Sequence, residues 1–161
     1  MKKLTMFLML TIIGGLLLAA CSNDEPKVVE PTLSANEMVN EMLSKIEQPM
    51  MMELTDEQVQ DIYNIDPEKL ADYAIRIPMM NVKSNEIAIL KVKDVADVPA
   101  VEEAVKQRAQ TVQQQFETYL PDQYENAKNY KVVTKGNYVL FVISDQADEL
   151  VAEYDRFFNE Q

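Results

Sequence analysis

Tyr130-Lys-Val-Val-Thr134, Lys135-Gly136-Asn137 and Tyr138-Val-Leu-Phe-Val-Ile143 form the stretch that decides the fold. The outer segments carry β-branched and aromatic residues and the middle one carries turn residues, so the stretch predicts a β-hairpin. The second strand is apolar on both faces, which is typical of a central strand. Ser144-Asp145 then caps a closing helix.

An earlier stretch repeats this order at a constant offset. Val82-Lys-Ser-Asn-Glu-Ile-Ala-Ile-Leu-Lys-Val-Lys-Asp94 aligns with residues 133–145, and in each a polar turn precedes an apolar strand, an Asp and an amphipathic helix. The helix after Asp94 is the longest of the chain and ends at Leu120-Pro121. We interpret the repeat as a β-β-α unit used twice. The alternative is that all hairpin–helix units share this sequence pattern.

The N-terminal part of the domain predicts two helices and one further strand. Ser34-Ala-Asn-Glu37 and Thr55-Asp-Glu-Gln58 are capping boxes, each followed by apolar residues at helical spacing. Residues 48–53 read as an apolar connector. Residues 73–82 favour a strand, but proline cannot donate to a ladder, so Pro78 predicts an edge strand or a bulge.

Together these patterns predict an α+β fold for a single domain over residues 34–161. We expect a four-stranded antiparallel sheet built from two β-β-α units with helices on one face. One long and one short N-terminal helix would precede it. The other sheet face would then be partly open, and we expect a binding surface there.

Residues 1–20 have the pattern of a secretory signal. Lys2 and Lys3 precede an apolar run that ends in small residues. The run is too short, and too promptly followed by polar residues, for a spanning helix. The segment lies outside the fold.

Leu18-Ala19-Ala20-Cys21 resembles the lipobox of bacterial lipoproteins. The resemblance implies cleavage before Cys21, diacylation of its sulfur (palmitate and related chains) and a tether over residues 21–33. The alternative is an ordinary signal with an incidental cysteine. Two or more acyl chains hold a protein stably on a membrane, so the expected location is the extracytoplasmic face of the cell membrane.

The order of elements and the lipobox are similar to those of uncharacterised Gram-positive lipoproteins that carry a domain of unknown function. This resemblance implies no activity.

Composition excludes several classes of function. Without Lys2 and Lys3 the basic residues fall from 15 to 13 against 27 acidic ones, a net charge of about −14. Such a domain repels nucleic acid, so we expect no nucleic-acid partner. The chain has no histidine and one cysteine. Histidine-dependent nucleophilic catalysis and histidine or thiolate metal sites are therefore excluded once Cys21 is lipidated.

Three features carry candidate sites for a ligand or partner. Met50, Met51 and Met52 form an apolar patch for partner contact, and methionines in general are ligands for Cu(I). Acidic groups suggest Ca²⁺, although no calcium-loop spacing is present. Arg108 lies on the apolar stripe of the long helix, where it either pairs with an acid such as Asp72 or Asp155 or marks an anion site. The two acidic groups are Asp56, Glu57, Asp61 and Asp66, and Asp145, Asp148 and Glu149.

We therefore expect a membrane-anchored, non-enzymatic binding or accessory module for a protein or cell-wall partner. No catalytic residue, metal site or cofactor is assigned. The alternative is a lipoprotein that binds a small ligand or a metal at the methionine-rich or acidic site. A carboxylate-dependent hydrolase comes third, because no pair of carboxylates is singled out.

Overall fold

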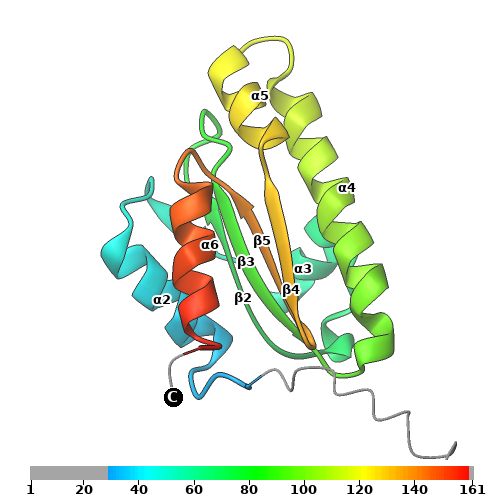
Figure 1. The fold of residues 1–161 in the computed structure, drawn as a ribbon. Coiled ribbons are helices and arrows are strands. Elements are labelled where there is room, and N and C mark those ends of the chain that lie inside the picture. The colour runs from blue at the N-terminus through cyan, green and yellow to red at the C-terminus, as the bar shows by residue number, and fades with distance from the viewer. Residues whose placement is uncertain (1–28, 160–161) are drawn as a thin grey trace, which may run out of the picture.

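The computed structural model describes residues 29–159, and its core is a five-stranded antiparallel sheet with helices on both faces (Figure 1). The strand order is β1-β2-β3-β5-β4. The strands are β1 (Met51–Glu53), β2 (Leu70–Pro78), β3 (Glu86–Val92), β4 (Lys131–Lys135) and β5 (Tyr138–Ile143). The helices are α2 (Ala35–Lys45), α3 (Asp56–Tyr63), α4 (Val98–Phe116), α5 (Pro121–Lys128) and α6 (Ala147–Arg156), with single 3₁₀ turns at Pro67–Lys69 and Val95–Asp97.

The two predicted hairpins are present and join through β3 and β5 at the centre of the sheet. Ile89 and Leu140, which are equivalent in the sequence repeat, are direct partners in this pairing. Every residue of β5 is buried, which confirms its predicted central position. Gly136 closes the second hairpin with a φ of 58°, a left-handed conformation that glycine adopts without a steric penalty.

The prediction of four strands was wrong, because Met51–Glu53 forms a fifth strand instead of a connector. Met51 pairs with Pro78 and Glu53 with Arg76. This short strand covers β2, so β2 is not an edge strand. The predicted alternative, a bulge, does not lie at Pro78, because the register of β2 shifts at its other end, between Leu70 and Asp72. Pro78 lies at the last position of β2, where its missing N–H interrupts little of the ladder. Residues 124–129 were expected to be irregular, but residues 121–128 form α5.

The prediction that the helices lie on one face was also wrong. One core lies between the sheet and α2 with α6, and includes Met38, Ile89 and Leu140. The other lies between the sheet and α3 with α4, and includes Leu90, Val105 and Phe141. The open sheet face expected to bind a ligand therefore does not exist.

The physical reason is that β3 and β5 are apolar on both faces. In β3, Ile87 and Ile89 contact one core, whereas Ala88 and Leu90 contact the other. Full burial of each large aliphatic side chain stabilises the fold by about 1.5–3 kcal/mol. A sheet face left exposed to solvent would lose several such contributions. The helices after β3 and β5 consequently go to opposite faces.

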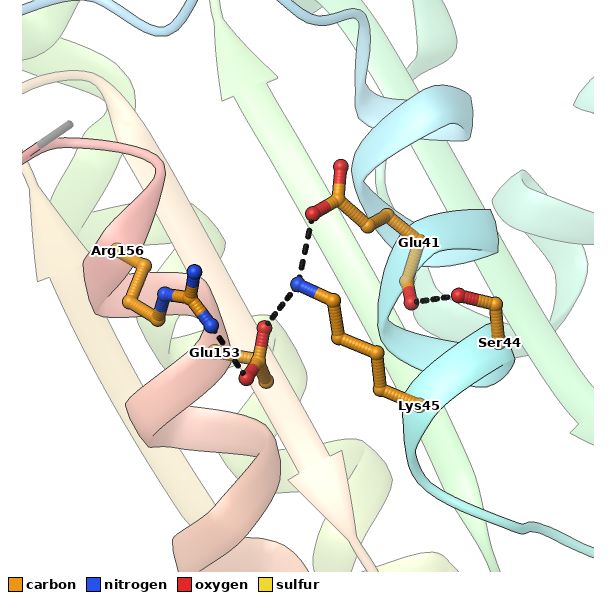
Figure 2. A network of polar contacts seen from close by, with 5 residues as sticks. All are labelled: Glu41, Ser44, Lys45, Glu153 and Arg156. Carbon is orange, nitrogen blue, oxygen red and sulfur yellow. Dashed lines mark hydrogen bonds and ion pairs between the residues drawn. The ribbon is translucent and has the colours of Figure 1, made fainter. Parts of the chain in front are cut away.

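A polar network joins the two helices of one layer at their surface (Figure 2). The Lys45 Nζ of α2 lies 2.8 Å from Glu41 Oε1 and 2.8 Å from Glu153 Oε2 of α6. Arg156 Nη1 lies 3.1 Å from the other oxygen of Glu153. Exposed ion pairs stabilise little, so the apolar contacts beneath this network hold the layer together.

Candidate functional site: an amide-lined pocket at one end of the sheet

The predicted patch Met50–Met52 lies on and beside the edge strand β1. Met50 is 73 % exposed and Met52 is 39 % exposed, whereas Met51 packs against the core beneath α2. Met79 and Met80 are also exposed, and Met79 N donates a 2.9 Å hydrogen bond to Met50 O. We call Met50, Met52, Met79 and Met80 the methionine patch.

The other candidate groups do not assemble into metal sites. Met38 and Met42 are fully buried in the core, away from any solute. Asp66 caps a 3₁₀ turn, and Asp56 accepts a hydrogen bond from the Tyr73 hydroxyl. Burial, with a smaller effect of this bond, raises the pKa of Tyr73 to about 12. Within residues 29–159, no three His, Cys, Asp or Glu side chains are grouped so that they could hold a metal ion.

Arg108 forms an ion pair with Glu86, not with Asp72 or Asp155. Its Nε and Nη2 reach the two carboxylate oxygens at 3.0 and 2.9 Å, and Glu86 is 1 % exposed. The Tyr63 hydroxyl donates to the same carboxylate. Burial of the Tyr63 phenol, together with the negative charge of Glu86, raises the pKa of Tyr63 well above its usual range. We call Tyr63, Glu86 and Arg108 the ionic triad.

The ionic triad connects α3, β3 and α4, and most polar groups of its three side chains bond to one another. Glu86 and Arg108 also line a small cavity of about 230 Å³ beside Met79 and Met80. Because Glu86 already accepts from both Tyr63 and Arg108, the triad is best explained as a structural feature of the core.

A larger cleft of about 700 Å³ lies where β3 begins and β5 ends. Five side-chain amides surround it, contributed by four separate segments, and we call it the amide pocket. The amide residues are Gln48, Asn85, Gln123, Asn126 and Gln146. Gln48 follows α2, Asn85 precedes β3, and Gln146 follows β5. Antiparallel pairing of β3 with β5 brings the last two together, since Glu86 is opposite Ile143.

Gln48 holds the amide pocket together. Its Oε1 accepts from Asn85 Nδ2 and from Ser144 Oγ, each at 3.0 Å. Its Nε2 donates to its neighbour's backbone and to Gln146 Oε1. On the other side, Gln123 Oε1 accepts from the Ser84 backbone at 2.9 Å. This network fixes the orientations of the surrounding amides.

Several amide atoms of the pocket are left without a partner among the described residues. Asn85 is only 5 % exposed, and its Oδ1 accepts no hydrogen bond there. Asn126 donates to Ser84 Oγ, and its Oδ1 is likewise unused. Gln146 Nε2 is an unused donor. The pocket therefore offers both acceptors and donors to a ligand.

A second cleft of about 690 Å³ continues the amide pocket past α5. The two clefts share Asp122, Asn126 and Asp145 as lining residues. Clefts of this size are typical of small-molecule and peptide sites. Together they form a trough between α5 and the turn that joins β5 to α6.

The trough lies at the opposite end of the sheet from the point where the N-terminal segment joins the domain. Lys91, near the end of β3, lies 3.1 Å from Glu30, which precedes α2. Asn85 lies at the other end of β3, and a rise of about 3.4 Å per residue places Glu86 about 17 Å from Lys91. Figure 1 shows α5 at one end of the sheet and the blue segment that leads into α2 at the other.

Sequence reasoning missed the amide pocket because its residues are spread over the chain and share no motif. The only usable signal was that Asn85 and Ser144 flank the paired ends of two strands. The predicted lipidation site, Cys21, lies outside the described residues. No helix within residues 29–159 is long and apolar enough to cross a bilayer.

Comparison with known proteins gives one match. A family model described as "Domain of unknown function (DUF4358)" matches residues 44–144. The match begins near the end of α2 and extends to Ser144, so it includes all five strands. No curated protein and no solved structure matches the chain.

Proposed function

The chain belongs to the DUF4358 family, and we propose that it is a lipid-anchored, extracytoplasmic, non-enzymatic binding module for a cell-wall or protein partner. The observation that carries the proposal is the amide pocket, with its unused donors and acceptors. Unused hydrogen-bond donors and acceptors that line one pocket support a binding role.

The position of the trough supports a partner away from the membrane. If Cys21 carries the acyl chains, the anchor attaches near Glu30 and Lys91, and the trough at the far end of the sheet points outward. The net charge of about −14 without the signal disfavours contact with anionic headgroups. A partner in the wall, or a protein beyond the membrane surface, fits this arrangement.

The alternative of a small-ligand lipoprotein is supported by the cleft volume of about 700 Å³. Such a ligand would raise the melting temperature of the protein, because binding to the native state alone stabilises it. A partner held only through the methionine patch would instead be unaffected by changes in the amide pocket.

The test is binding of the full chain, purified in detergent, to isolated cell walls and to solubilised envelope protein. The double substitution Asn126→Ala with Gln146→Ala removes one unused acceptor and one unused donor. We expect roughly tenfold weaker binding, which corresponds to about 1.4 kcal/mol. The matched control is Gln60→Ala with Gln110→Ala, which removes two exposed amides from α3 and α4 and should bind as wild type.

Two results would contradict the proposal. Equal binding by the pocket variant and the control would exclude the amide pocket as the binding site. Retention of a Cys21→Ser variant in the membrane fraction would exclude the lipid anchor.

A further inference from the structure

The charges around the amide pocket narrow the chemistry of its ligand. The lining includes three carboxylates, Glu47, Asp122 and Asp145, against one ammonium group, that of Lys83. None of these four side chains forms an ion pair with a described residue. A surplus of negative charge therefore remains at the pocket.

The second cleft does not neutralise this surplus. Its lysines are already paired with its own acids: Lys128 Nζ lies 3.0 Å from Glu125, and Lys131 Nζ lies 2.9 Å from Asp148. Asp122 and Asp145, which form no ion pair with a described residue, line both clefts and therefore lie where the two clefts of the trough join. A cation in the ligand would be stabilised at that point.

Acidic side chains on a surface are not by themselves a site, and Asn85 supplies the independent observation. It is 5 % exposed, it lines the amide pocket, and its Nδ2 is fixed by Gln48 while its Oδ1 is unused. That oxygen is open to the pocket and accepts no hydrogen bond from a described residue, so it is available to a ligand N–H. Asn126 Oδ1 offers a second such acceptor, and Gln146 Nε2 offers a donor.

We infer that the trough binds a peptide segment that carries a free primary ammonium group, and this inference rests on the proposed function. Peptide N–H groups match the unused amide oxygens, a peptide carbonyl matches Gln146 Nε2, and the ammonium group matches Asp122 and Asp145. A neutral glycan offers hydroxyl groups but leaves the carboxylates unpaired.

The experiment measures peptide binding to the full chain in detergent by calorimetry. The probes are the capped peptide acetyl-Ala-Gln-Lys-Ala-amide and the same peptide with an acetylated lysine side chain. Acetylation removes the charge, replaces the three ammonium donors by one amide N–H and adds an acetyl group, so we expect the acetylated peptide to bind at least about tenfold more weakly. A tetramer of N-acetylglucosamine is the third probe, and we expect it not to compete.

Matched variants locate the effect. Asp122→Asn with Asp145→Asn should abolish the preference for the ammonium peptide. Glu57→Gln with Asp61→Asn changes the charge by the same amount at exposed positions of α3 and should preserve it.

Equal binding of both peptides, binding of neither, or competition by the sugar tetramer would overturn the inferred ligand. In each of these cases the proposed function still stands if the full chain binds cell walls or envelope protein through Asn126 and Gln146. Loss of that binding as well would overturn both.

Discussion

Glu86 shows at the scale of a single residue how the fold accommodates a buried charge. It begins β3 on the face covered by α4, and its carboxylate is met by Arg108 and Tyr63. Burial alone would lower the pKa of Arg108, but the bidentate bond to Glu86 more than offsets this and the pKa lies above its ordinary value. Arg108 is therefore charged within the core, and each residue of the pair depends on the other.

We predict that Arg108→Met lowers the free energy of unfolding by about 3–5 kcal/mol, because it leaves a buried carboxylate uncompensated. Urea denaturation at pH 7 measures this. Lys106→Met, on the same helix but exposed, should change stability by no more than about 1 kcal/mol.

A variant that replaces all three residues of the ionic triad tests whether the stability lost in Arg108→Met comes from the uncompensated charge. The triple variant Tyr63→Phe, Glu86→Leu and Arg108→Met should recover most of the lost stability, since an apolar replacement leaves no orphaned charge. If Arg108→Met alone were as stable as wild type, the bidentate pair would not be formed in solution.

At the scale of an element, α2 depends on its N-terminal cap. Ser34 N donates to Glu37 Oε2 at 2.8 Å, and the Ser34 hydroxyl accepts from Glu37 N. The backbone bond from Ser34, followed by the bond from its side chain, lowers the pKa of Glu37 below its ordinary value of 4.5. Charged Glu37 is thus favoured by the folded state.

A lowered folded-state pKa gives stability that is fully present above the unfolded value and lost as the pH falls through the folded value. We predict that Glu37→Ala is less stable than wild type at pH 7 and that the difference shrinks as the pH falls below 4.5. Thermal unfolding across this pH range checks it. A difference in stability that stays constant over this range would contradict the prediction.

At the scale of the whole molecule, the protection of backbone amides against hydrogen exchange should depend on the position of each strand in the sheet. β3 and β5 are paired on both sides and covered on both faces, whereas β1 is a three-residue edge strand. We predict that the slowest-exchanging amides lie in Ile87–Leu90 and Val139–Val142 and that β1 exchanges early. Hydrogen exchange measured by mass spectrometry tests this. Uniform protection of β1 and β5 would contradict it.

The sequence predicted local structure well where one segment carries its own signal. The capping boxes placed α2 and α3, the turn residues Lys135-Gly136-Asn137 placed the second hairpin, and the apolar residues on both faces of residues 138–143 placed β5 inside the sheet. It failed where the outcome depends on a distant partner. Met51–Glu53 is a strand only because it pairs with the free edge of β2, and no local sequence pattern in residues 51–53 predicts this pairing.

The sequence by itself determined the α+β class, the antiparallel hairpins and the acidic surface, because periodicity, capping and charge act over a few residues or over the sum of all of them. The tertiary structure alone decided that both sheet faces are covered and that five amides from distant segments form one pocket. The reason is that these two outcomes depend on contacts between residues far apart in the chain. The ends of β3 and β5 must pair, and α2, α5 and the β5–α6 turn must lie beside those ends, as the contact between Gln48 and Gln146 shows.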